Sequence, residues 1–185
     1  MSDIETLQVA IQTRWPGAPG EKASRYIGRF FDGTRRGTKI VAKVDGNHGT
    51  YVVSIEADPK GVSSACSCYI GRSGGCHHCA ALAHTFLCTP DSFREIQPTP
   101  RATVGGLPEL QTYLAGVTLE DLLAQLKAHG ITQKAFAEGI GMSARHLGTI
   151  KSAEARNHFF NELGATKLAV LWVVEHVGKG KQNGG

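Results

Sequence analysis

The sequence lacks any apolar run that approaches the roughly 20 residues needed to cross a bilayer. Residues 1–5 are polar and acidic, without the charged-then-apolar pattern of a secretion signal. A large excess of one charge is also missing. The chain has 20 Lys and Arg residues and 16 Asp and Glu residues, which gives a net charge of +4. This modest excess does not by itself indicate a nucleic acid partner. We therefore expect no membrane partner and a cytoplasmic location.

Motifs for catalysis are absent as well. The chain has no glycine-rich phosphate loop, no paired-carboxylate motif and no acidic cluster of the kind found in nucleases. A nucleophile with a base in reach is the remaining possibility, and Cys76 with His77 is the one such pair. A metal ion bound at Cys76 would occupy that thiol. We therefore expect a protein without enzymatic activity.

Cysteine is scarce, and its arrangement is informative. The chain has five cysteines, an odd number that does not suit a disulfide framework and indicates a reducing compartment. Three thiols and an imidazole fall within thirteen residues, as Cys66-Ser67-Cys68, seven further residues, and Cys76-His77-His78. Sulfur and imidazole ligands in this number suit a tetrahedral zinc ion. The stretch therefore predicts a zinc site.

The spacing explains how these ligands converge. Cys66 and Cys68, one residue apart, point to the same side of an extended segment. Residues 69–75 contain three glycines, so this loop can fold back sharply. Cys76 and His78 then lie at the start of a predicted helix, residues 77–87, and the positive end of that helix favours a thiolate.

The identity of the fourth ligand is open at this stage. Cys79 can replace His78, and His77 is close as well. In a helix, however, Cys79 shares an apolar stripe with Leu82, Ala83 and Phe86, which indicates a place in the core. The predicted ligands are Cys66, Cys68, Cys76 and His78. Four protein ligands leave no position for water, so we expect one structural Zn²⁺.

The pattern C-x-C-x₇-C-x-H resembles the SWIM zinc finger, a small module found beside helicases, transposases and recombination-associated proteins. The resemblance covers residues 20–88 and includes the strands before the first ligand and the helix after the last. It implies a role in binding nucleic acid or protein, without activity of its own.

The pattern along the chain predicts an α+β fold. We expect a small antiparallel β-sheet, zinc-binding and SWIM-like, followed by an all-α helix-turn-helix domain. The expected divisions are a helical lead-in (1–20), the SWIM-like zinc finger domain (21–90), a linker rich in proline and glycine (91–108), the helical helix-turn-helix domain (109–177) and a disordered tail (178–185).

The first half combines helical and strand patterns. Helices are predicted at residues 4–14 and 21–31, the second ending at Gly33. Alternating apolar residues predict strands at 38–44 and 51–57, joined by a hairpin loop that contains His48. A third short strand would lead into Cys66.

The second half has helical periodicity throughout. Capping residues Thr118, Thr132 and Ser143 each precede a predicted helix, and Gly130 ends the first of them. These helices span 119–126, 133–140 and about 144–151. Two more are predicted at 157–163, ending at Gly164, and at 166–177.

Residues 132–143 resemble the helix-turn-helix of Cro-like phage repressors, and the resemblance extends over residues 118–177. It implies that small Ala137 lets two helices approach closely and that Gly141 forms the turn with positive φ. It also implies that Ile140 and Leu147 hold the pair together. The second helix would then enter the major groove of double-stranded DNA.

The resemblance assigns roles to the polar residues of these helices. Arg145 is the expected reader of a base, because its planar guanidinium can contact guanine through two hydrogen bonds. Gln133, Lys134 and Lys151 are expected at phosphates. Further outward residues of the second helix are Ser143, His146 and Thr149.

A basic cluster lies in the first half. Six cations fall between residues 25 and 43, opposed only by Asp32. We expect a surface around Arg35, Arg36 and Lys39 to add affinity for phosphates that does not depend on sequence. The alternative is a solvated surface with the charges dispersed over several faces.

Residues 168–174 are apolar nearly all round a helix, so this helix must be buried by its own domain or by a second copy. A homodimer is therefore a possible assembly, and Trp172 is expected in the core. Residues 107–177 contain six Lys or Arg and seven Asp or Glu. This balance favours an alternative function, a protein-interaction adaptor that docks onto a recombinase, helicase or polymerase.

Overall fold

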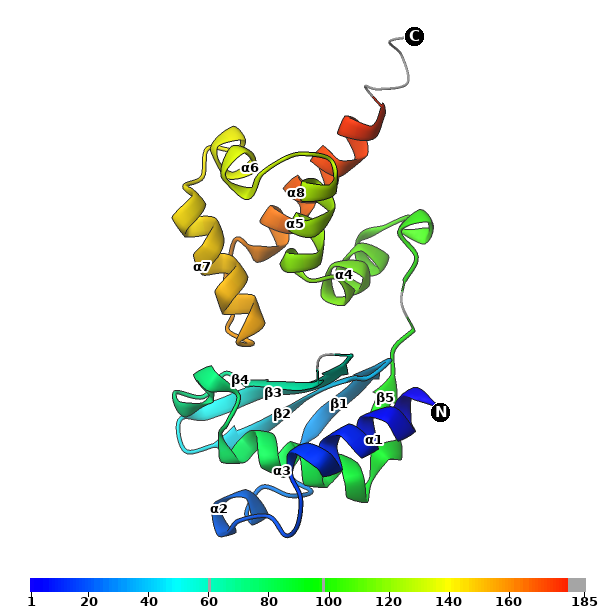
Figure 1. Cartoon of the computed structure of the whole chain (residues 1–185), viewed down its shortest axis with the longest axis vertical. Coiled ribbons are helices and arrows are strands. Elements are labelled where there is room, and N and C mark those ends of the chain that lie inside the picture. Colours follow the sequence, from blue (N-terminus) through cyan, green and yellow to red (C-terminus); the bar gives the residue numbers. More distant parts are fainter. Residues whose placement is uncertain (60, 98, 180–185) are drawn as a thin grey trace. The chain divides into compact units, whose positions relative to one another are not determined.

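The computed structural model describes residues 1–59, 61–97 and 99–179. The chain has an α+β fold, as predicted, with a five-stranded sheet and several helices. It divides into two compact units: Met1–Gln97 with Arg156–His158 form the first, and the remaining described residues form the second (Figure 1). The division falls within the segment expected as a linker.

The first unit is built on the sheet. Its strands are β1 (Phe31–Arg36), β2 (Lys39–Gly46), β3 (Gly49–Asp58), β4 (Gly61–Cys66) and β5 (Arg94–Glu95). The strand order is β4-β3-β2-β1-β5. Strands β1 to β4 are antiparallel neighbours, but β5 runs parallel to β1, with Thr34 opposite Arg94. The sheet is therefore mixed, and the prediction of a purely antiparallel sheet was wrong.

The β2–β3 hairpin confirms the two central strands that the sequence predicted. Gly46 pairs with Gly49, so His48 lies in a two-residue turn. Alternate residues of β2, namely Ile40, Ala42 and Val44, are buried on one face. This alternation is the physical signature of a sheet with one face against a core.

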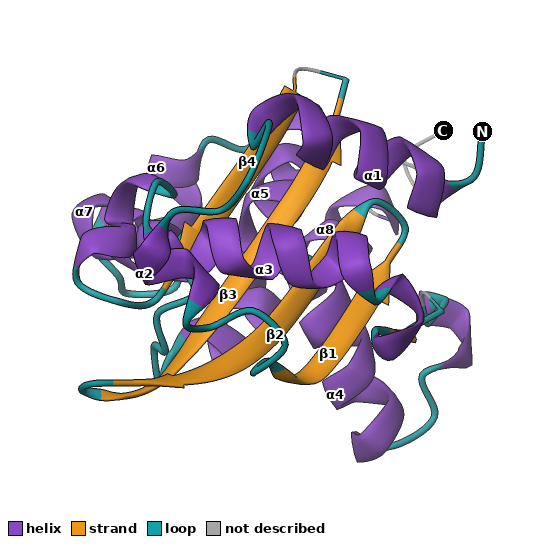
Figure 2. Cartoon of the chain, turned by 90° about the horizontal axis from the view of Figure 1, so that it is seen from below, coloured by secondary structure: helices purple, strands orange, loops and turns teal. Residues whose placement is uncertain are grey.

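Three helices accompany the sheet: α1 (Asp3–Arg14), α2 (Glu21–Ser24) and α3 (His77–Cys88). Figure 2 shows α1 and α3 lying across the same face of the strands. Leu7 and Ile11 of α1 and Phe86 of α3 join the buried strand residues in one apolar core. The Ser2 hydroxyl and the Glu5 carboxylate form a capping box that starts α1.

The helix predicted at residues 21–31 is much shorter than expected. It ends at Ser24, and Gly28 adopts a φ of +72°, a left-handed conformation that stops an α-helix. Phe31, predicted to be helical, is the first residue of β1. Gly33, predicted as the helix stop, lies in β1 where the pairing with β2 shifts register.

The second unit consists of α4 (Leu107–Gly116), α5 (Leu119–Ala128), α6 (Gln133–Gly139), α7 (Ala144–Ala155) and α8 (Leu163–Lys179). The three predicted caps are confirmed: Thr118 accepts from the Asp121 amide, Thr132 from Ala135 and Ser143 from His146. Leucines of α5 pack with Leu147, Ile150 and Val170 in a second apolar core.

Other helix predictions need correction. Residues 157–162 do not form a helix, and Leu163 and Gly164 belong to the first turn of α8 rather than to a helix end. Helix α4 was not expected, because the Leu107-Pro108 pair was assigned to the linker; proline is well tolerated in a first helical turn. The expected linker also contains β5. Of the expected tail, residues 178–179 end α8 and residues 180–185 lie outside the described residues.

Helix α8 is buried on one side only. Val170 and Leu171 are in the core, but Leu168 is exposed and the Trp172 side chain is 60% exposed. The prediction that Trp172 lies in the core was therefore wrong. None of the helices in the described part of the chain is long and apolar enough to cross a membrane.

Candidate functional site

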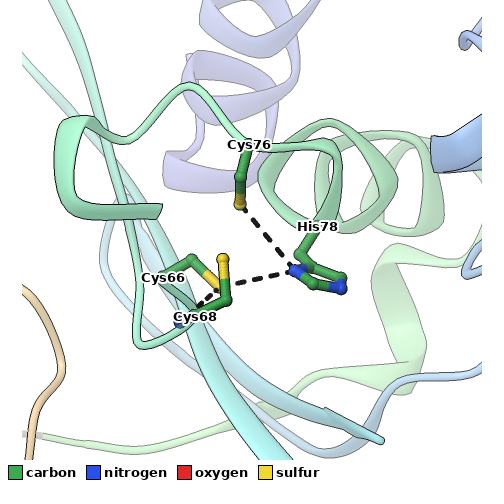
Figure 3. A group of neighbouring side chains, drawn as sticks. All are labelled: Cys66, Cys68, Cys76 and His78. Carbon is green, nitrogen blue, oxygen red and sulfur yellow. Dashed lines mark hydrogen bonds between the residues drawn. The ribbon is translucent and has the colours of Figure 1, made fainter. Parts of the chain in front are cut away.

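The structure brings the four predicted metal ligands together (Figure 3). Cys66 is the last residue of β4, and Cys68 follows in a bend. Cys76 is the N-cap residue of α3, and His78 lies in the first turn of that helix. All four side chains are buried. The end of β4 and the start of α3 thus supply the ligands, and the loop between them connects the two pairs.

Backbone contacts hold this loop in place. A 3₁₀ turn, Ile70–Ser73, follows Cys68, and the Gly71 amide donates a hydrogen bond to Cys68 Sγ at 3.1 Å. Gly74 has a φ of +71°, and a Cβ atom there would lie 2.1 Å from the Ser64 carbonyl oxygen. Only glycine fits at this position. The sequence predicted that glycines let this loop fold back sharply, and Gly74 is the glycine that the fold requires.

The ligand atoms lie close enough together to share one metal ion. His78 Nδ1 lies 3.7 Å from Cys66 Sγ and 3.9 Å from Cys76 Sγ. All four ligand atoms lie within 4.8 Å of one another. Around zinc, with bonds of about 2.3 Å to sulfur and about 2.0 Å to nitrogen, neighbouring ligand atoms are about 3.5–3.8 Å apart. The cluster of three cysteines and one histidine can therefore hold one metal ion, and its geometry is compatible with zinc.

The pKa values of the clustered thiols are shifted in opposite directions. Hydrogen bonds from Cys66 and Cys79 lower the pKa of Cys76, which favours its thiolate. The hydrogen bond to Cys76, together with burial, raises the pKa of Cys66, and burial raises the pKa of Cys68. Because neighbouring thiolates repel one another, three of them are stable together only beside a cation. A divalent ion satisfies that requirement.

Cys79 and His77 are close to the cluster but outside the group of four. Cys79 Sγ lies 3.7 Å from Cys76 Sγ, yet Cys79 is fully buried among Leu82 and Phe86, as its apolar stripe predicted. The His77 imidazole is half-buried, and burial lowers its pKa. The fifth cysteine, Cys88, is exposed at the other end of α3.

Aromatic rings surround His78, and sequence reasoning missed them. The ring centroid of Tyr26 lies 4.7 Å from that of His78, and the ring of Tyr51 lies 5.0 Å away. Val53 of β3 pairs with Cys66 of β4, so the chain places Tyr51 beside the ligands. The position of Tyr51 beside the ligands follows from the register of β3 and β4, which cannot be read from the spacing of the cysteines.

The basic cluster of the first unit is largely paired with acids. Arg35 is only 7% exposed and lies 3.1 Å from Glu95 of β5. Lys39 lies 3.1 Å from Glu56, and Arg36 is half-buried. Arg35 is therefore not available at the surface that the sequence predicts, whereas Arg36 and Lys39 remain partly exposed. The cause is the pairing of β1 with β5, which brings Glu95 onto Arg35.

The predicted DNA-contacting residues of the second unit lie on α6 and α7 or directly before α7. Gln133 and Lys134 are exposed in the first turn of α6, and Lys134 lies 3.8 Å from Glu138. Ser143, Arg145 and Thr149 are exposed at the start and along one side of α7. Two others are half-buried: His146 packs edge-on against Phe160 with ring centroids 5.6 Å apart, and Lys151 lies 3.7 Å from Glu120.

The turn between α6 and α7 partly matches expectation. Ala137 and Leu147 are buried where the helices meet, and Gly141 has a φ of +73°. Ile140, however, is 38% exposed and does not hold the pair together. Met142 takes that role, since it packs on the core and its amide donates to the Ala137 carbonyl at 2.8 Å.

Comparison of the chain with protein-family models, with curated proteins and with solved structures found no match. Function must therefore be inferred from the chemistry of its own side chains. Two features carry such an inference, the Cys66–His78 cluster of the first unit and the exposed side of α7 in the second.

Proposed function

We propose that the chain is a non-enzymatic DNA-binding protein, a transcriptional regulator or a factor of a mobile element, whose first unit is stabilised by a structural zinc ion. Cys66, Cys68, Cys76 and His78 would hold this ion. Soft thiolate ligands with one imidazole suit zinc, and four protein ligands leave no position for a water nucleophile. The zinc, when bound, supplies charge compensation for the thiolates and crosslinks β4 to α3.

The exposed side of α7 is the proposed DNA-reading surface, and it is the observation on which the function depends. Arg145, Thr149 and Ser152, spaced at intervals of four and three residues, are all exposed along one side. Within the described residues, no acidic side chain forms an ion pair with Arg145. A long cation flanked by small polar residues suits an approach to base edges.

The other polar residues of α6 and α7 are placed to contact the DNA backbone in this proposal. Lys134 and Gln133 at the start of α6, with Lys151 on α7, would contact phosphates, and Ser143 and His146 would flank the base reader. The ion pairs of Lys134 with Glu138 and of Lys151 with Glu120 are long, and both acids are exposed, so these pairs contribute little and a phosphate can replace the acid.

One observation favours the alternative, an adaptor that docks on a nucleic-acid-processing enzyme. Residues 107–177 contain six cations and seven acids, so this half has no overall attraction for DNA. An exposed apolar groove of about 440 Å³ in the same unit, lined by Phe136, Ile140, Trp172 and Val173 among others, concerns the assembly of the chain rather than this alternative. We propose a second copy of the chain as its occupant, which accords with the homodimers of the repressors that this half resembles.

A selection with random duplex DNA, followed by binding measurements, tests the DNA-binding proposal. The double variant Arg145→Ala, Lys151→Ala should lose sequence-specific binding while its circular dichroism and melting curve stay unchanged. The matched control is Arg14→Ala, Lys43→Ala, which removes the same charge from the first unit. Equal binding by all three proteins would instead support the adaptor.

A further inference from the structure

A hollow of about 350 Å³ lies directly beside the proposed zinc ligands, in the first unit. Its lining includes Tyr26, Tyr51 and Tyr69, the imidazoles of His77 and His78, and Asn47. The rings form a connected set: His77 and His78 have centroids 4.1 Å apart, and Tyr26 lies 5.4 Å from His77. Tyr69 at the rim is 83% exposed. A hollow lined by this many aromatic rings is suited to a flat aromatic ligand.

His78 leaves one polar atom without a partner in this wall. Its side chain is only 3% exposed, and its Nε2 atom has no hydrogen bond within the described residues. Figure 3 shows Nδ1 turned toward the cysteines and Nε2 on the opposite side of the ring. A metal ion on Nδ1 leaves the proton on Nε2, which then acts as a donor. A buried donor without a partner indicates a ligand that supplies an acceptor.

A second hollow, of about 540 Å³, adjoins the first and shares Tyr26, Asn47 and His77 with it. Three cations line it, namely Lys22, Arg25 and Arg29, against the single carboxylate of Asp45. All three cations are exposed. Arg25 pairs with Glu21, but no acidic side chain among the described residues pairs with Lys22 or Arg29.

We propose that these joined hollows bind single-stranded nucleic acid. One unpaired base stacks among Tyr26, Tyr69 and His77, and a carbonyl oxygen on its edge accepts the hydrogen bond from His78 Nε2. The phosphates that follow it lie along Lys22, Arg25 and Arg29. Aromatic platforms beside a cationic track are the usual means by which proteins hold single strands.

The form of the ligand follows from the same features. A paired base in a duplex shows only its edges, so its face cannot reach the Tyr26 and His77 rings. Three cations exceed what the one phosphate of a nucleoside monophosphate requires, and this favours a strand over a mononucleotide. The site lies in the first unit and is separate from the duplex-binding surface proposed on α7, so the two proposals can succeed or fail independently.

The test measures binding of the zinc-loaded full chain to a fluorescent twelve-nucleotide single strand, to its duplex and to the free mononucleotide. The single strand should bind at least tenfold more tightly than the mononucleotide. Tyr69→Ala should weaken strand binding about fivefold or more, and Tyr69→Phe should retain it, because stacking needs only the ring. Lys22→Ala with Arg29→Ala should reduce the salt slope by about 1.4.

The controls separate this site from others. The variant Arg14→Ala, Lys43→Ala removes equal charge elsewhere on the first unit and should bind the strand normally. Arg145→Ala should weaken duplex binding alone, so its failure to do so affects the α7 proposal and not this one. A mononucleotide that binds as tightly as the strand, or a strand indifferent to both Tyr69→Ala and the Lys22, Arg29 variant, would overturn the inference.

Discussion

The Glu154 carboxylate of α7 lies 2.6 Å from the Lys167 ammonium group of α8 in the interior of the helical unit. The second carboxylate oxygen accepts a hydrogen bond from the Leu119 amide at the start of α5, at 2.7 Å. Lys167 also donates to the Leu114 carbonyl near the end of α4, at 2.8 Å. One largely buried ion pair thus joins four helices.

Removing the Lys167 ammonium should destabilise the helical unit strongly. Lys167→Met leaves the Glu154 carboxylate, only 18% exposed, without its cation, and we expect the free energy of unfolding to fall by roughly 3 kcal/mol. The control Lys151→Met breaks the exposed pair with Glu120 and should cost roughly 0–1 kcal/mol. Urea unfolding followed by circular dichroism measures both. Similar losses in the two variants would contradict the structural role of Lys167.

Helices, strands and caps that are determined by residues adjacent in the sequence could be predicted from the sequence. The β2–β3 hairpin, the caps Thr118 and Thr132, and the helix after Cys76 each follow from a local pattern. Contacts distant in sequence could not be predicted. Pairing of Arg94 with Thr34 adds a strand to the sheet, and no local pattern contains it.

The same distinction applies to the site. The four metal ligands lie within thirteen residues, so their spacing was enough to predict that they meet. The burial of Arg35 against Glu95, and the rings of Tyr26 and Tyr51 around His78, depend on register and on a turn at Gly28. These determine which cations and rings remain available to a ligand, and only the folded chain reveals them.

Loss of one ligand should remove the metal and unfold the first unit. We expect Cys76→Ser to abolish stoichiometric zinc in purified protein and to lower the melting temperature of this unit, since the metal link between β4 and α3 is lost. Cys88→Ser, at an exposed thiol on the same helix, should retain one zinc per chain and melt normally. Elemental analysis and calorimetry check the result. Wild-type protein that melts identically with and without chelator would rule out a structural metal.

Zinc binding should release protons in a number set by the thiol pKa values. The pKa values of Cys66 and Cys68 are raised, so both thiols hold their protons at neutral pH, whereas the lowered pKa of Cys76 leaves a thiolate. Zinc must then displace about two protons per ion, and its apparent affinity falls as the pH decreases. Titration calorimetry in buffers of different ionisation enthalpy measures this number. Release of no protons, or an affinity that rises on acidification, would contradict the assignment.

Duplex binding by α7 should weaken steeply with salt. Lys134 and Lys151 are the proposed cationic contacts to phosphates, and each contributes about −0.9 to the slope of log K against log salt concentration, so we expect a slope of roughly −2 per chain. Lys134→Ala should reduce this slope by about 0.9 without changing sequence preference, whereas Arg145→Ala should relax that preference. An affinity that stays constant between low and moderate salt would contradict phosphate contact.

The exposed side of α8 should determine the oligomeric state. Leu168 and Trp172 lie one helical turn apart and are both exposed, and Trp172 also lines the 440 Å³ apolar groove with Ile140 and Val173. If a second copy covers this surface, Trp172→Ser should convert a dimer into a monomer, because an indole accounts for much of the apolar area that such a contact can bury.

Phe159→Ser removes an even more exposed aromatic ring elsewhere in the unit and should leave the dimer intact. Sedimentation velocity over a range of concentrations distinguishes these outcomes. Wild-type chain that stays monomeric throughout would exclude the second copy as occupant and favour a different protein partner.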